Sequence, residues 1–396
     1  YVRALREPFA VDWLGGLLGK VLPDVIVNAT SFAASSSTEP RLPGVLERAD
    51  CPILQVAFAG VPEADWQAAA RGLGPRDLAM NVALPEVDGR IFTRAVAFKA
   101  AERFDEVTQC GIVVPKVAPD RVAFVADLAA NWAKLRRTPP AHRRIALILA
   151  NYPNRDGRIG NGVGLDTPES TAAILSALGE AGYDIGRDIG AAPRDSTGLM
   201  RLMTGGVTND LTSLDRPGDT LLPLADYQAA FARVPTEARQ AMIDRWGAPE
   251  ADPFVRNGAF RLPVHRFGNV AVAVQPARGY NIDPKESYHD PALPPPHAYL
   301  AFHIWLERHF GAQALVHVGK HGNLEWLPGK AVSLSQSCFP EICAGPLPQL
   351  YPFIVNDPGE GTQAKRRGGA VMVDHLTPPL AATPLYDRLL TLRQLV

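Results

Sequence analysis

Short runs of consecutive apolar residues, separated by polar and glycine-rich stretches, recur along the whole chain. A strand that is buried on both faces of a parallel sheet is apolar throughout, whereas a half-buried strand alternates between apolar and polar residues. The runs predict seven strands, of which the first three match buried strands of a parallel sheet. They span residues 25–28, 53–58, 110–114, 145–150, 269–275, 314–318 and 351–355.

Between these strands, apolar residues recur at the three- and four-residue spacing of helices that are buried on one face. The predicted helices span 120–137, 236–246 and 297–310, and two more begin at residues 167 and 357. Asp120, Thr167 and Asp357 are expected as N-caps, and a proline follows both Thr167 and Asp357 at the first helical position. Strands that alternate with helices predict an α/β fold, with parallel or mixed sheets flanked by helices.

The length of 396 residues suggests more than one domain, since a domain holds about 150 residues. The stretch T-P-P-A-H-R-R at 138–144 has the composition of a linker. We therefore expect a multi-domain protein with a Rossmann-like or flavodoxin-like α/β domain over 1–138 and a second α/β region over 144–396, truncated at its C-terminal end. The chain begins without Met and ends in a helical pattern, so it is expected to be an internal segment of a longer protein.

Composition narrows the class of protein. The chain has 46% hydrophobic and 20% charged residues, typical of a soluble globular protein, and its net charge of −1 gives no general attraction to nucleic acid or to an anionic membrane. No apolar run approaches the roughly 20 residues of a membrane-spanning helix, and the first residues are no signal peptide. The four cysteines form no C-x-x-C pair, which favours a reduced, cytoplasmic setting.

Several motifs for stand-alone chemistry are absent. The nearest match to a Walker A loop, G-G-L-L-G-K near the start, is one residue short and lacks its Ser or Thr. There is no G-x-S-x-G, H-E-x-x-H or paired-cysteine zinc motif. A glycine-rich loop at 151–166 lacks the G-x-G-x-x-G spacing of dinucleotide sites, so it is either a ligand-facing loop or a structural one.

Histidine is concentrated late in the chain, because all but one of the nine histidines follow residue 264. His303 and His309 lie on a predicted helix and are expected to be structural. Directly after the predicted strand 314–318, glycines and a proline break any helix and leave a polar loop, where open α/β sheets tend to place their sites. His321 in this loop is the best functional candidate, and an apolar neighbourhood would raise the pKa of Glu325 and suit it to proton transfer. His317, on the strand, is either a buried core imidazole or a functional group.

Four stretches of the sequence are distinctive enough to be compared with known families. They are A-N-Y-P-N-R-D-G-R-I-G-N-G-V-G-L-D-T-P-E-S at 150–170, H-V-G-K-H-G-N-L-E-W-L-P-G-K at 317–330, G-P-L-P-Q-L-Y-P-F-I-V-N-D-P-G-E-G-T-Q-A-K-R-R at 345–367 and D-H-L-T-P-P-L at 374–380. Together they closely resemble the CobN family of aerobic cobaltochelatase large subunits, which is related to the porphyrin-binding H subunit of magnesium chelatase. The magnesium branch usually has Thr, Ser and Phe-Met where this chain has Lys320, Asn323 and Trp326-Leu327, so the resemblance favours the cobalt and corrin branch.

The resemblance implies a ligase that inserts Co²⁺, as a substrate metal, into hydrogenobyrinic acid a,c-diamide during cobalamin biosynthesis. This chain would bind the corrin macrocycle and the metal. An AAA+ ATPase subunit and an integrin-like subunit of the von Willebrand A type would use ATP and Mg²⁺, in keeping with the absence of a P-loop from this chain. No nucleic acid or membrane partner is expected.

Metal insertion must remove protons from the ring nitrogens while a partly dehydrated cation enters, and imidazole and carboxylate suit both tasks. Under the resemblance, His317, His321 and Glu325 are expected to be transient metal ligands or bases. The carboxylates and amides of the ring need cations and hydrogen-bond donors. The expected substrate-binding residues are Arg155, Arg158, Arg278, His297, Lys320, Asn323, Glu360, Lys365 and Arg366. Lys365 and Arg366 also lie at a predicted helix C-terminus, where complementing the helix dipole is the alternative role.

Three alternatives stay open at this point. The chain could belong to a magnesium chelatase-type porphyrin-binding subunit, to a tetrapyrrole-binding protein without chelation, or to a stand-alone metal hydrolase that uses the same histidines and glutamate. The hydrolase would work without any ATP-hydrolysing partner, so dependence on partner subunits and ATP distinguishes it from a chelatase.

Overall fold

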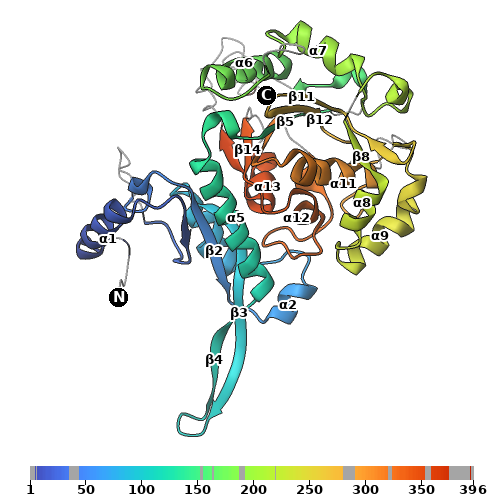
Figure 1. Cartoon of the computed structure of the whole chain (residues 1–396). Helices are drawn as coiled ribbons and strands as arrows, with labels where there is room; N and C mark the ends of the chain where they lie inside the picture. Colours follow the sequence, from blue (N-terminus) through green and yellow to red (C-terminus); the bar gives the residue numbers. More distant parts are fainter. Residues whose placement is uncertain are drawn as a thin grey trace.

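The structure is a computed structural model that describes residues 5, 7–34, 44–151, 155–162, 165–186, 192–218, 220–279, 290–319, 323–352, 358–373 and 393. Two main sheets organise this part of the chain, one formed before residue 118 and the other from residue 145 onward. Helices flank both sheets (Figure 1). The predicted α/β class is therefore confirmed. In these ranges no helix has the length and apolar character needed to cross a membrane.

The first sheet has four strands in the order β1-β2-β3-β4. They are β1 (Ile26–Asn28), β2 (Ile53–Ala59), β3 (Ile91–Asp105) and β4 (Cys110–Val117). The first three are parallel, as the apolar runs at 25–28 and 53–58 predicted for β1 and β2. β4 is antiparallel to β3 and mostly exposed, so the prediction of a buried parallel strand at 110–114 is wrong. The reason is that the outer halves of β3 and β4 form a hairpin that projects beyond the rest of the molecule (Figure 1).

Short helices fill the connections of this sheet, and one long helix follows it. They are α1 (Pro8–Val21), α2 (Glu63–Ala68), α3 (Pro75–Leu78), a π-helical turn (Ala79–Ala83), α4 (Leu84–Glu86) and α5 (Pro119–Arg137). The predicted helix 120–137 is confirmed as α5, with its buried Val125 packed against β2 and β3. The predicted cap is wrong, because Pro119 already begins the helix. Asp120 lies in the first turn, and its carboxylate pairs with Arg121 at 2.9 Å.

The second sheet has six strands in the order β11-β12-β5-β13-β14-β15. Their bounds are β5 (Ile145–Leu149), β11 (Val264–Phe267), β12 (Val270–Val274), β13 (Ala314–Val318), β14 (Gln349–Pro352) and β15 (Val371–Val373). The predicted strands 145–150, 269–275 and 314–318 are confirmed, and β14 includes the start of 351–355. All neighbours are parallel except β11, which is an antiparallel edge. The carboxyl ends of the five parallel strands therefore meet at one edge of the sheet.

Helices cover both faces of the second sheet because its strands are apolar on both. Ile145, Leu147 and Leu149 of β5 pack with α6 and α7, while Ala146 and Ile148 face the core shared with α8, α9, α11 and α12. Figure 1 shows α6 and α7 on one side of the sheet and α11 and α12 on the other. The helices are α6 (Thr167–Glu180), α7 (Ser196–Gly205), α8 (Leu224–Phe231), α9 (Thr236–Trp246), α11 (His297–Ile304), a π-helical turn that continues it (Trp305–Phe310), α12 (Phe339–Ala344) and α13 (Pro358–Gly368).

The predicted helices 236–246 and 297–310 are confirmed, whereas the cap of α6 differs from the prediction. Its N-cap is Asp166, whose carboxylate accepts a hydrogen bond from the Glu169 backbone N–H at 3.0 Å, and Thr167 is the first helical residue. α13 begins at Pro358 as expected, and its predicted cap Asp357 lies outside the described residues.

Small elements complete the second part. The two-stranded sheet is β6 (Asn161–Gly162) with β7 (Leu165–Asp166), and the three-stranded sheet is β8 (Leu221–Pro223), β10 (Ala259–Arg261) and β9 (Val255–Arg256). The 3₁₀ turns among the described residues are Glu47–Ala49, Pro140–His142, Asp156–Arg158, Leu211–Asp215, Pro249–Ala251 and Leu324–Trp326.

The segment 330–341 of the second part packs into the first part. Val332 lies in the core of the first part together with Trp66. The Lys330 ammonium donates to the backbone oxygens of Trp66, Gln67 and Ala69 at 2.7, 2.8 and 3.0 Å, at the C-terminal end of α2. The division into domains 1–138 and 144–396 stays a prediction, because each range holds its own sheet but the second range contributes to the core of the first.

Candidate active site at the carboxyl edge of the second sheet

The loop that carries the candidate residues leaves β13 through a close turn. Gly319 follows the strand with a φ of 142°, and a Cβ atom at this position would lie 2.6 Å from the Cβ of Ala150 at the end of β5. Glycine alone avoids this clash and tolerates this backbone conformation. Residues 323–330 then form a loop with one 3₁₀ turn, Leu324–Trp326, which carries Glu325. The described part of the stretch is therefore a loop and not a helix, as predicted.

Tyr351 joins two of the predicted site residues, His317 and Glu325. All three are buried, with exposed fractions of 3% for His317, 1% for Glu325 and 2% for Tyr351. The Tyr351 ring on β14 stacks on the His317 imidazole with ring centroids 4.4 Å apart, and its hydroxyl donates to Glu325 Oε2 at 3.0 Å. Burial raises the pKa of Tyr351 well above its usual value, and the Glu325 carboxylate adds to the shift, so the hydroxyl stays a neutral donor. The fold thus brings together residues that the sequence separates by 34 positions.

A second imidazole, that of His303 on α11, lies in the same buried region. Burial, with His317 nearby, lowers the pKa of His303 to about 3. Burial also lowers the pKa of His317 to about 3, although the Gln349 side chain, which is outside hydrogen-bond geometry, opposes part of the shift. Among the described residues, no group hydrogen-bonds to the ring nitrogens of either histidine. Both rings are therefore neutral at pH 7, which is the form that offers a lone pair to a cation or a proton.

Buried polar atoms without a hydrogen-bond partner are rare in folded proteins, and each costs about 1–3 kcal/mol. Two adjacent imidazoles in this state are therefore a reason to look for function at this edge. His303 was expected to be structural from its place on a helix, and only the fold places it beside His317. There was little indication in the sequence of a functional role for His303, since one histidine on an apolar helix face is usually part of the core.

The predicted metal ligands lie partly inside and partly outside the described residues. In the described ranges, no three side chains of His, Cys, Asp or Glu converge closely enough to hold a metal ion. His321 and Lys320 lie outside these ranges, so the triad of His317, His321 and Glu325 stays a prediction. His317 offers a nitrogen donor and Glu325 an oxygen donor, and imidazole is a ligand type that suits divalent transition metals.

Comparison with known proteins decides the family. The model of the CobN/Magnesium Chelatase family matches residues 7–396. The chain belongs to the CobN/magnesium chelatase family. This agrees with the resemblance found from the four sequence stretches.

Several relatives in this family are close in sequence or in structure. Aerobic cobaltochelatase subunit CobN of a Sinorhizobium species is 55% identical over 396 residues, which are 100% of this chain and 31% of the relative. The H subunit of the magnesium chelatase of Rhodobacter capsulatus is 31% identical over 343 residues, which are 83% of this chain and 28% of the relative. A solved structure, the catalytic subunit of cobaltochelatase from Mycobacterium tuberculosis, matches with a TM-score of 0.80 at 39% identity, covering 100% of this chain and 33% of that one. The chain thus spans about a third of the length of these family members.

Two of the predicted substrate-binding residues in this family member lie near the buried cluster. Arg278 follows β12, is 2% exposed and donates to the Asp290 backbone oxygen at 2.9 Å. The Asn323 amide donates to the backbone oxygen of Pro276 at 3.3 Å, which ties the loop after β13 to the loop after β12. Both residues therefore lie in loops at the carboxyl edge of the second sheet.

Arg155 and Arg158 lie at the 3₁₀ turn in the loop after β5, with exposed side chains. Asp156 holds this turn, because its carboxylate accepts a hydrogen bond from the Thr208 hydroxyl at 2.6 Å and pairs with Arg216 at 2.9 Å. Two exposed guanidinium groups on an anchored turn are suited to bind carboxylates of a ligand.

Three predicted substrate-binding residues are engaged elsewhere. His297 is fully buried, with Nδ1 2.6 Å from the Tyr227 hydroxyl and Nε2 2.9 Å from the Gly247 backbone oxygen, so neither ring nitrogen is left for a ligand. Arg366 binds both carboxylate oxygens of Glu86 at 3.1 and 3.0 Å, and Lys365 lies 3.9 Å from the same group. These contacts compete with a ligand for the polar atoms of the three side chains, and the assignment of His297, Lys365 and Arg366 to substrate binding stays a prediction. The side chain of Glu360 lies outside what the structure describes.

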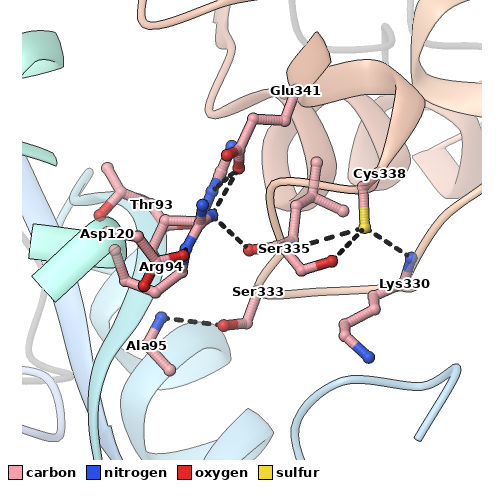
Figure 2. A network of polar contacts seen from close by, with 12 residues as sticks. Thr93, Arg94, Ala95, Asp120, Lys330, Ser333, Ser335, Cys338 and Glu341 are labelled. Carbon is pink, nitrogen blue, oxygen red and sulfur yellow. Dashed lines mark hydrogen bonds and ion pairs between the residues drawn. The ribbon is translucent and has the colours of Figure 1, made fainter. Parts of the chain in front are cut away.

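The sequence analysis missed a polar network that supports the site loop from the first part of the chain. The Glu341 carboxylate on α12 accepts hydrogen bonds from Arg94 on β3 at 2.8 Å and from Arg121 on α5 at 2.7 Å. The Ser333 hydroxyl accepts one from the Ala95 backbone N–H at 2.8 Å, and Figure 2 shows this contact together with that of Arg94 and Glu341. An arginine inside an apolar strand was the available signal, but the sequence did not identify its partner, which is more than 200 residues away.

Proposed function

We propose that this chain is part of the macrocycle- and metal-binding subunit of an ATP-dependent chelatase that inserts Co²⁺ into hydrogenobyrinic acid a,c-diamide. The observation that carries the proposal is the buried group of His317, Tyr351 and Glu325 at the carboxyl edge of the sheet. It occurs in a chain that is 55% identical to an aerobic cobaltochelatase subunit. Identity to a magnesium-chelatase H subunit is lower, at 31%, which favours the cobalt branch.

The chemistry assigns a different task to each side chain. Entry of a cation into the ring displaces protons from ring nitrogens, and a carboxylate in an apolar neighbourhood is a suitable acceptor for them. Tyr351 holds one oxygen of Glu325 in place, and the neutral ring of His317 offers a lone pair to the cation. His321 would be the further metal ligand or base. Arg155, Arg158, Arg278, Lys320 and Asn323 would bind the carboxylates and amides around the ring.

Further subunits complete the proposed reaction. ATP and Mg²⁺ would be used by an AAA+ ATPase subunit and by a subunit of the integrin-like von Willebrand A type, since this chain has no Walker A loop. The reaction would take place in the cytoplasm, as the cysteine usage suggests.

Cobalt insertion into the corrin, followed by the colour change of the ring, tests the proposal in the complete subunit with its partners and ATP. We expect His321→Ala to abolish insertion and Glu325→Gln to lower its rate by about 100-fold, since general-base catalysis contributes about 10²–10⁴-fold. Both variants should bind the corrin with nearly unchanged affinity, and the exposed Glu307→Gln is the matched control. Unchanged insertion by both variants would refute the assigned roles. Hydrolysis of an ester or peptide by this chain alone would favour the hydrolase, and faster insertion of Mg²⁺ into a porphyrin would favour the magnesium branch.

A further inference from the structure

Arg367, in the last turn of α13, binds the backbone of the turn that carries Glu325. Its guanidinium donates from Nη1 to the Glu325 backbone oxygen, from Nη2 to that of Leu327 at 2.8 Å and from Nε to that of Lys330 at 2.9 Å. The residue is 7% exposed. One side chain therefore holds three carbonyl groups within six residues of the site loop.

Other backbone hydrogen bonds of the described residues also hold this loop, among them one from the Phe339 N–H to the Pro328 oxygen at 3.0 Å. Within the 3₁₀ turn, Trp326 N–H donates to the Asn323 oxygen and Leu327 N–H to the Leu324 oxygen, both at 3.2 Å. A 3₁₀ turn has poorer hydrogen-bond geometry than an α-helix and rarely extends by itself. The charge-assisted hydrogen bonds from Arg367 are of the stronger kind and reach the turn at three points. Arg367 thus adds three hydrogen bonds to this loop beside the two within its 3₁₀ turn.

The far end of the same loop is anchored to the first part of the chain. Lys330 donates through its ammonium to three carbonyls of α2, and its backbone N–H donates to the Cys338 thiol at 3.3 Å (Figure 2). Lys330 therefore fixes this end of the loop even if the Arg367 guanidinium changes position. A lysine at position 367 would leave some of the three carbonyl groups without a hydrogen-bond donor, while the contacts of Lys330 stay in place.

The neighbours of Arg367 on α13 have a different task. Arg366 and Lys365 face Glu86 of the first part, so they join the two parts. Burial lowers the pKa of Arg367, and a buried guanidinium is retained only where it is well hydrogen-bonded. Of the three consecutive cationic residues, Arg367 is the one committed to the turn.

We propose that Arg367 is a positioning residue, which holds the turn 325–330 so that the Glu325 carboxylate meets Tyr351 and the reacting ring. The consequence for turnover rests on the proposed function of Glu325, whereas the effect on the turn does not. A lysine at this position keeps the charge but lacks the planar fork that reaches several carbonyls. Arg367→Lys should therefore disturb the turn without removing the positive charge.

Hydrogen exchange tests the effect of Arg367 on the turn, and cobalt insertion tests its effect on turnover. Both are measured on the complete subunit. Arg261→Lys is the matched control, because Arg261 likewise binds two loop carbonyls, those of Arg216 and Gly218, away from the site. We expect Arg367→Lys to speed amide exchange in 323–330 by about tenfold or more and Arg261→Lys to leave that segment unchanged. Equal exchange in 323–330 for Arg367→Lys and the wild type overturns the proposal, whatever the activity.

Turnover supplies the second readout. We expect Arg367→Lys to lower kcat for insertion by about 10- to 100-fold, as a small misplacement of a catalytic group does, with the KM for corrin changed less than about threefold. In the Glu325→Gln background the same substitution should have little further effect. A merely structural arginine would instead add its loss to that of Glu325→Gln, and such additivity overturns the positioning role. Wild-type subunit that inserts no cobalt would refute the proposed function and leave the exchange result as the test of Arg367.

Discussion

Replacing Glu341 by glutamine should loosen the contact between the two parts of the chain. In the native structure a single carboxylate oxygen, Glu341 Oε2, accepts hydrogen bonds from the buried guanidinium groups of Arg94 and Arg121. The side chains of Arg94 and Glu341 are only 4% and 8% exposed. Burial lowers the pKa of Arg94 and Glu341 raises it, so the carboxylate is the compensating charge for this arginine. Glutamine has the same shape but no charge, so the buried Arg94 would lose its compensating charge and Arg121 would keep only its pair with Asp120.

The expected loss in the free energy of unfolding follows from these contacts. Each hydrogen bond to a charged partner contributes about 1.5–3 kcal/mol. Removing one partner of a buried ion pair costs about 3–5 kcal/mol, because the remaining charge stays buried. Glutamine can still accept one hydrogen bond, so we expect the free energy of unfolding to fall by about 3 kcal/mol, at the lower end of that range.

Urea unfolding followed by tryptophan fluorescence measures this loss, because Trp66 donates to the Ser333 backbone oxygen and so reports on the same contact. Glu307→Gln is the control, since Glu307 is 45% exposed and its carboxylate lies 3.7 Å from Arg308. Surface ion pairs contribute about 0–1 kcal/mol, so this variant should stay close to the wild type. A loss below about 1 kcal/mol for Glu341→Gln, with an unchanged denaturant slope, would refute the reasoning about the buried charges.

Two further predictions concern pH and the turn after β13. Burial lowers the pKa of His265 below the value of about 6.5 that it has in the unfolded chain. The unfolded chain therefore binds more protons, and stability should fall as the pH drops below about 6.5. His265→Gln should lose less stability than the wild type between pH 7.5 and 5 in urea unfolding, and equal losses would contradict the assignment. Gly319→Ala should destabilise the protein by about 2 kcal/mol more than Gly258→Ala, because both glycines have positive φ but only at 319 would the new Cβ meet another side chain. Equal melting temperatures of the two variants would show that the contact with Ala150 yields.

Much of the second sheet was accessible from sequence because its strands are continuous apolar runs. β5, β12 and β13 were predicted nearly to the residue, since burial on both faces requires such runs. The same reasoning failed for β4, whose apolar residues lie on a projecting hairpin, and it missed β3. A pattern of apolar residues indicates that a strand is possible, but it does not indicate whether another layer covers it.

Some features of the candidate site were likewise predicted from sequence, and others were not. His317, Glu325 and the loop after β13 were identified from residue types and from the position of glycines, because these features act over a few residues. The stacking of Tyr351 on His317, the position of His303 near His317 and the three carbonyls bound by Arg367 were not predicted. Lys365 and Arg366 were expected at the substrate, although they contact Glu86.

The difference has a physical cause. Local sequence sets the elements and their order here, since hydrogen bonding, glycine turns and apolar periodicity depend on neighbouring residues. Which cation meets which carboxylate depends on how the sheets and helices pack, and the three basic residues at 365–367 are equivalent until that packing turns two toward Glu86 and one toward the turn of Glu325. The sequence alone therefore predicts the α/β architecture, the family and the candidate site loop, and the packing of the two parts decides which side chains contact that loop.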